Sequence, residues 1–205
     1  MVMFAITRIP HLLPPSFSAA YALMFCAGVY FPGRVAWWLP LGTMLVTDIA
    51  LDIYYLQQGW NVFDIPVLRY QLINYGSYAC LIWFGRRFNP RVSFLGLLGG
   101  GILGAIAFYL ITNTASWLFN PFRNPEYTRS WLGWLRALTL GTAGWPETWQ
   151  FFRNTFLSGG LFTGLIVGAM KLTAPAESAQ EKEAPQTPDE EEKPTGEEAA
   201  GHANS

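Results

Sequence analysis

The sequence contains few of the residues that carry charge or chemistry. Asp, Glu, Lys and Arg make up 13% of its 205 residues, whereas 51% are hydrophobic. This composition excludes an ordinary soluble domain, a collagen-like chain and a nucleic-acid binder with a basic face. Cys26 and Cys80 lie in apolar stretches as small hydrophobic residues, so they imply no disulfide framework. His11 and His202 lie near opposite ends, which argues against a haem, zinc or histidine-based catalytic site.

Catalytic and nucleotide-binding motifs are also missing. The sequence shows no nucleophile motif and no metal-ligand cluster, and the glycine run at 99–101 lacks the Lys-Ser/Thr pair of a phosphate-binding loop. We therefore expect no enzyme activity, no cofactor and no resident metal. Energised transport by this chain would need another subunit to hydrolyse ATP.

The few charges are distributed unevenly along the chain. Residues 1–173 contain eleven Lys or Arg and five Asp or Glu, a net charge of +6. Residues 174–205 contain two Lys and nine acids, a net charge of −7. This second part has too little apolar surface to offset the entropy lost on ordering. We expect a transmembrane helical domain over 1–173 and a disordered acidic tail over 174–205.

Six apolar stretches approach the ~20 residues that a helix needs to cross a bilayer. The fifth is the weakest, because it contains Arg136 and Pro146, and a broken helix is tolerated only where neighbouring protein satisfies its backbone. The sequence predicts an all-α integral membrane protein, a bundle of about six transmembrane helices with the fifth irregular. The expected spans are 17–32, 36–57, 65–84, 94–119, 131–149 and 154–172.

Short loops and tryptophans near the span ends are typical of a multi-pass protein whose surroundings are the lipid bilayer. Lys and Arg near the membrane number four on one side and five on the other, so the positive-inside rule does not fix the orientation. The densest cluster is Arg86, Arg87 and Arg91, which taken alone favours a cytoplasmic position for its loop.

Two carboxylates lie within the second expected span. Asp48 and Asp52 are four residues apart and therefore share one helix face. A carboxylate in hydrocarbon is costly, so it faces the bundle interior and pairs, protonates or binds a cation. Asp48 fits a substrate, cation or proton site, and it fits equally an ion pair with Arg69 or Arg153 that fixes helix packing. For Asp52, nearer the span end, contact with water is the favoured interpretation.

Polar side chains also mark three other spans. Gln71, Asn74 and Tyr78 form a stripe on the third span, which suits either a polar cavity or interhelical hydrogen bonds. Polar clusters end the fourth span and begin the sixth, where free backbone groups help to bind polar ligands or are simply capped. The residues that we expect to line or brace a ligand pocket are Asp48, Asn74, Thr112, Asn113, Arg153 and Asn154.

Small residues recur every four positions in three spans, a spacing that lets helix backbones approach closely. These seams are helix-packing faces first, and spacing alone does not show whether one of them receives a partner protein. The seams are Ser18, Ala22 and Cys26; Gly96, Gly100 and Gly104; and Gly160, Gly164 and Gly168.

Three segments resemble a family of bacterial membrane proteins of unknown function that belongs with the substrate-binding (S) components of energy-coupling-factor transporters. They are residues 39–48, 111–117 and 151–157, and the most specific is the Phe-Phe-Arg-Asn-Thr string at 151–155. The resemblance covers most of residues 12–172. The sequence departs from the pattern at Ser158 and Gly159, where a Gly-Asp pair is expected.

The resemblance implies a multi-pass six-helix bundle in the bacterial cytoplasmic (inner) membrane. Such a protein binds a vitamin-like or metal-related small molecule and docks on a coupling membrane subunit driven by two ATPases. By the same analogy, the seam at Ser18, Ala22 and Cys26 meets the coupling subunit. The alternative is a structural or accessory membrane protein that has no small-molecule ligand.

Overall fold

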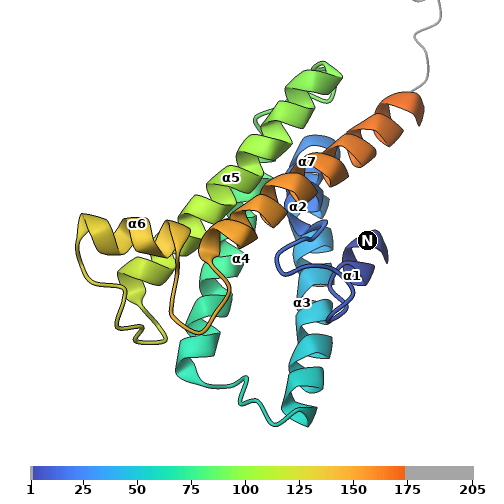
Figure 1. Ribbon diagram of the computed structural model, residues 1–205. Coiled ribbons are helices and arrows are strands. Elements are labelled where there is room, and N and C mark those ends of the chain that lie inside the picture. Colours follow the sequence, from blue (N-terminus) through green and yellow to red (C-terminus); the bar gives the residue numbers. More distant parts are fainter. Residues whose placement is uncertain (1, 174–205) are drawn as a thin grey trace, which may run out of the picture. The chain divides into compact units, whose positions relative to one another are not determined.

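The computed structural model describes residues 2–173, and within them every regular element is a helix (Figure 1). The expected tail at 174–205 lies outside the described residues. The helices are α1 (Val2–Ile6), α2 (Ala20–Tyr30), α3 (Val35–Gln57), α4 (Ile65–Gly85), α5 (Phe94–Phe119), α6 (Trp131–Thr139) and α7 (Thr148–Thr173). The all-helical expectation is confirmed for this part of the chain.

Three of the described helices, α3, α5 and α7, are long and apolar enough to cross a membrane. They have 23, 26 and 26 residues, and each therefore exceeds the ~20 residues that a bilayer requires. α4 is comparably long at 21 residues but is not among these three. These helices indicate a membrane protein.

Two elements differ from the expected spans. α2 has 11 residues, and α6 has 9. At 1.5 Å per residue they measure about 16 and about 14 Å, well short of the ~30 Å hydrocarbon core. The stretch 131–149 breaks after Thr139 because Gly141 and Gly144 adopt positive φ angles of 72° and 84°, conformations that end a helix. α7 consequently begins at Thr148, six residues before the expected start at 154.

α2 is the centre around which the other helices pack. Nine of its eleven residues are buried, and its neighbours are α3, α4, α5 and α7. Its closest contact is with α4, where a Cβ added at Gly28 would lie 2.2 Å from the carbonyl oxygen of Ile82. A Cβ at Gly85 would likewise lie 2.2 Å from the carbonyl oxygen of Phe25. The two helices therefore touch backbone to backbone, which only glycine permits at both positions.

α5 and α7 pack along each other in opposite directions. Methyl groups placed at Gly160, Gly164 and Gly168 would lie 3.5, 3.7 and 3.9 Å from the side chains of Ile102, Leu98 and Phe94, respectively. Each step of four residues forward along α7 thus matches a step of four backward along α5. The segment containing α6 therefore returns the chain to the end of the bundle where α5 stops, and α7 ends where α5 begins (Figure 1).

Replacing Gly85 with alanine tests the α2–α4 contact. We expect Gly85→Ala to lower the stability of the detergent-solubilised protein by about 1–3 kcal/mol or more, because the added methyl group overlaps a backbone carbonyl. The measurement is the thermal midpoint followed by tryptophan fluorescence. Gly76→Ala in the same helix is the control, since nothing lies within 4 Å of its added Cβ. Equal midpoints for the two variants would contradict the backbone contact.

Candidate functional site

Asp48 lies at the centre of a polar cluster that joins three parts of the chain. The guanidinium group of Arg8 donates a hydrogen bond to Asp48 Oδ1 and forms a salt bridge with this carboxylate. The hydroxyl of Tyr75 donates to Asp48 Oδ2 at 2.7 Å. The side chains of Arg8 and Asp48 are only 17% and 14% exposed. This is the only salt bridge among residues 2–173. Both oxygens of a largely buried carboxylate are therefore satisfied from inside the protein.

A second pair lies one helical turn away. Gln71 Nε2 lies 3.3 and 3.4 Å from the two oxygens of Asp52. Asp48 and Asp52 are four residues apart on α3, and their partners Tyr75 and Gln71 are four apart on α4. Because the partner number falls as the α3 number rises, the two helices run antiparallel. The pairs form a two-rung polar ladder, which we call the α3–α4 ladder.

Arg8 belongs to the stretch 7–19, which follows α1 and packs near the start of α2 and of α7. The Thr7 hydroxyl accepts a hydrogen bond from the Ala19 amide at 3.2 Å, which closes this segment on itself. Asn154 Nδ2, on α7, donates to the Pro15 carbonyl at 2.9 Å. We call residues 7–19 the N-terminal segment. Its hydrogen bonds to α3 and α7 each involve a side chain, and the ring of Phe17 also packs against that of Phe162 on α7, with 6.0 Å between the ring centroids.

The expected pocket residues have different hydrogen-bond partners. Asp48 is in the ladder, and Asn154 holds the N-terminal segment, with Arg153 Nε 3.4 Å from its side-chain oxygen. Thr112 and Asn113 donate to carbonyls of their own helix, at 2.9 Å to Phe108 and 2.8 Å to Tyr109. Asn74 is half-buried on α4, between the two ladder residues of that helix.

Tyr78, expected on the polar stripe of α4, belongs to the apolar core. It is 8% exposed, and its ring lies 4.6 Å from that of Phe108 and 6.3 Å from that of Tyr21, measured between centroids. Tyr21 also packs on Phe108 at 5.0 Å. This aromatic cluster connects α2, α4 and α5 within the same core that contains Met44 of α3, one turn before Asp48.

The sequence analysis expected Arg69 or Arg153 as the ion-pair partner of Asp48, whereas the partner in the structure is Arg8. Arg153 instead lies with its guanidinium 5.6 Å from the ring centroid of Trp149, a cation–π arrangement on its own helix. One signal was present in the sequence. The four-residue spacing of Gln71 and Tyr75 matches that of the two aspartates, as two neighbouring antiparallel helices require.

The small-residue seams contribute mainly to packing within the chain. Ala22 is fully buried in a cluster with Phe162 of α7, Cys26 is 3% exposed, and the Ser18 hydroxyl accepts from the Ala20 amide. Ala22 and Cys26 of this seam are therefore covered by other parts of the chain, α7 among them. On α5, a Cβ at Gly100 would meet Phe25 at 2.7 Å and one at Gly104 would meet Leu81 at 3.1 Å, whereas Gly96 faces its own N-terminal turn. The third seam, on α7, faces α5.

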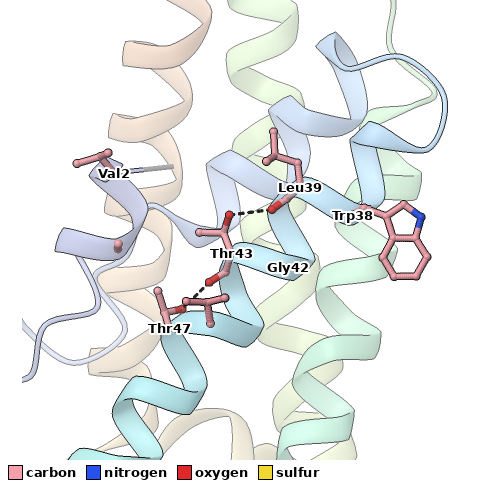
Figure 2. A pocket seen from close by; sticks show the side chains of 8 residues that line it. Val2, Trp38, Leu39, Gly42, Thr43 and Thr47 are labelled. Atoms are coloured by element: carbon pink, nitrogen blue, oxygen red, sulfur yellow. Dashed lines mark hydrogen bonds between the residues drawn. The ribbon is translucent and has the colours of Figure 1, made fainter.

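An open groove of about 460 Å³ lies between α1 and α3 (Figure 2). The hydroxyls of Thr43 and Thr47 donate to carbonyls of their own helix, at 2.8 Å to Leu39 and 3.1 Å to Thr43, so their methyl groups remain to line it. None of the expected pocket residues lines this groove, which suits an apolar occupant. Its lining comprises Val2, Ala5, Trp38, Leu39, Gly42, Thr43, Val46 and Thr47.

A second hollow, of about 480 Å³, lies beside α6 and contains Glu126 and Arg136 among its lining residues. The amide of Ala143 donates to Glu126 Oε1 at 3.0 Å, and this bond lowers the pKa of the carboxyl below its ordinary value of 4.5. Burial raises the pKa of the neighbouring Tyr127 phenol. Glu126 therefore fixes the turn between α6 and α7 while it is ionised.

The helices and the ladder define an all-helical protein that is suited to a membrane and holds a charged cluster between its helices. Residues 1–183 match the family of unknown function DUF6580, and the chain belongs to this family. No curated protein and no solved structure matches the chain.

Removing the Tyr75 hydroxyl tests the first rung of the ladder. We expect Tyr75→Phe to destabilise the protein by about 1.5–3 kcal/mol, the usual value of a hydrogen bond to a charged group. Thermal unfolding in detergent measures the loss. Tyr55→Phe provides the control, because Tyr55 lies near the end of α3 and is 39% exposed. If Tyr75→Phe unfolds at the temperature of the unaltered protein, the bond to Asp48 contributes nothing.

Proposed function

We propose that the protein is the small-molecule-binding subunit of a membrane transporter, resembling the S components of energy-coupling-factor transporters. It is a multi-pass protein of the bacterial cytoplasmic (inner) membrane and has no ATPase of its own. A coupling membrane subunit driven by ATPases supplies the energy. The resemblance of residues 151–155 and the absence of a nucleotide-binding motif support this proposal.

The observation that carries the proposal is the polar cluster around Asp48. Charged groups between apolar helices are costly, and they are retained mainly where they bind a ligand, move an ion or fix a packing arrangement. Here a carboxylate, a second carboxylate, an amide and a phenol lie on adjacent helices in two rungs. Carboxylate, amide and phenol groups that converge in an apolar setting are typical of sites for small polar ligands.

Arg8 closes this cluster from the N-terminal segment, which lies outside the long helices. α1 has five residues, whereas the ladder residues lie on helices of 23 and 21 residues. Displacement of the N-terminal segment leaves Asp48 without its cation, and a ligand that carries a positive charge or several hydrogen-bond donors replaces Arg8. The ligand is thus a cationic or donor-rich organic molecule, such as a vitamin-like compound. Among residues 2–173 no three His, Cys, Asp or Glu side chains gather as metal ligands do, which favours this class over a bare metal ion.

The second candidate function is a structural or accessory membrane protein. This function is favoured because both carboxylate oxygens of Asp48 already accept hydrogen bonds from side chains of the same chain. In that case the ladder only holds α3 against α4 and the N-terminal segment against α3.

Native mass spectrometry of the full-length protein in detergent separates the two functions. After incubation with a panel of water-soluble vitamins and metal ions, we expect one discrete non-lipid adduct on the unaltered protein. Asp48→Asn is expected to lose at least ten-fold of this adduct, because the substitution removes the charge that balances the ligand. Asp64→Asn is the matched control, since this carboxylate lies in the exposed loop before α4 and bonds only locally, to Asn61 at 2.6 Å.

Two outcomes would contradict the transporter subunit. One is that only lipid adducts form on the unaltered protein across the whole panel. The other is that Asp48→Asn lowers the unfolding temperature but retains the adduct, which would leave the carboxylate with a structural role alone.

A further inference from the structure

The topology brings five cationic side chains to one end of the helices. Arg86 donates to the Gly33 carbonyl at 3.1 Å, which places the loop between α2 and α3 against the end of α4. The loop 86–93 leads into α5, whose Phe94 lies beside Gly168 near the end of α7. We call this surface the basic end, and its cationic residues are Arg34, Arg86, Arg87, Arg91 and Lys171.

No described carboxylate balances this charge. The five acids within residues 2–173 lie in the second half of α3, in the loop before α4 or between α5 and α7, and these parts belong to the opposite end. They are Asp48, Asp52, Asp64, Glu126 and Glu147. The salt bridge of the described chain also lies away from the basic end, at Arg8. The opposite end holds six arginines with these five acids, so among residues 2–173 the excess of positive charge is concentrated at the basic end, and the acidic residues 174–205 follow α7 in the sequence.

Two arginines of the basic end have partners within the chain. The guanidinium of Arg87 lies 4.4 Å from the ring centroid of Trp83, which is 53% exposed near the end of α4. Tryptophan at the end of an apolar helix lies at the depth of lipid headgroups, and arginine beside it reaches the phosphates. Arg86 is fixed by its bond to Gly33, and both guanidinium groups remain exposed.

We propose that the basic end binds the phosphate of an anionic phospholipid. A guanidinium presents paired N–H groups that match phosphate oxygens, and each cation near an anionic membrane surface contributes on the order of 1 kcal/mol. Loops 31–34 and 86–93 supply four of the five cations, and Trp83 supports Arg87 at headgroup depth. This surface lies at the opposite end from the loop that joins α3 to α4, and it does not depend on the function proposed for the α3–α4 ladder.

The test is a lipid titration of the full-length detergent-purified protein, with bound lipid counted by native mass spectrometry. Dioleoyl phosphatidylglycerol is compared with dioleoyl phosphatidylcholine and with inorganic phosphate. The variant Arg86→Gln/Arg87→Gln/Arg91→Gln removes three charges from the basic end. The control Arg123→Gln/Arg129→Gln/Arg136→Gln removes three from the opposite end, and a third variant with lysine at 86, 87 and 91 keeps the charge.

We expect the affinity for phosphatidylglycerol to fall about a hundredfold in the glutamine variant of the basic end. The control at the opposite end should change it less than threefold, and the lysine variant should keep most of it. Raising the salt concentration should weaken phosphatidylglycerol binding to the unaltered protein, because salt screens exposed charges. This measurement does not depend on whether a variant folds.

Three results would overturn the proposal. Equal affinity for phosphatidylglycerol and phosphatidylcholine would exclude a headgroup charge preference. Displacement of the lipid by an equal concentration of inorganic phosphate would assign the surface to a soluble anion. A glutamine variant that binds lipid normally but unfolds earlier would show that the arginines only complement the negative ends of α2, α4 and α7, which terminate here.

Discussion

A carboxylate within an apolar helix has to be neutralised, and Asp48 is neutralised by contacts that join three parts of the described chain. Arg8 crosses from the N-terminal segment to α3, and Tyr75 crosses from α4 to the other oxygen. Three parts of the chain are thereby held at one point. Removing one partner leaves an unpaired charge in a poorly solvated position. Such a substitution therefore costs more stability than the loss of an apolar contact of similar size.

The remainder of the fold is held by a different kind of contact. α2 is almost wholly buried, and it approaches α4 through Gly28 and Gly85, while α5 and α7 pack through glycines that face large apolar side chains. Dispersion forces between close helices do not distinguish one ligand from another. Residues 2–173 therefore combine close apolar packing around α2, α4, α5 and α7 with a polar cluster between α3, α4 and the N-terminal segment, and the proposed function assigns recognition to this cluster.

The sequence predicted the helices better than it predicted the site. The stretches 36–57, 65–84 and 94–119 correspond within one residue at each end to α3, α4 and α5, because turn residues bound each apolar run. The fifth stretch, 131–149, was expected to be irregular, and its helix α6 ends at Thr139, before the turns at Gly141 and Gly144. Helical periodicity placed Asp48 and Asp52 on one face, but it relates residues within a helix only. The partner Arg8, forty residues earlier in the chain, is set by tertiary packing that periodicity does not describe.

The function proposed here requires Arg8 and Asp48 to act as one unit that closes the cluster, and a double-mutant cycle measures this most directly. Thermal stability in detergent is compared for the unaltered protein, Arg8→Gln, Asp48→Asn and the double variant. If the two side chains form a pair, each single substitution lowers the free energy of unfolding strongly. The loss in the double variant is then about 1–3 kcal/mol smaller than the sum of the two single losses. Additive losses would show that Arg8 and Asp48 do not interact, and neither the closure of the ladder nor its opening by a ligand could then be maintained.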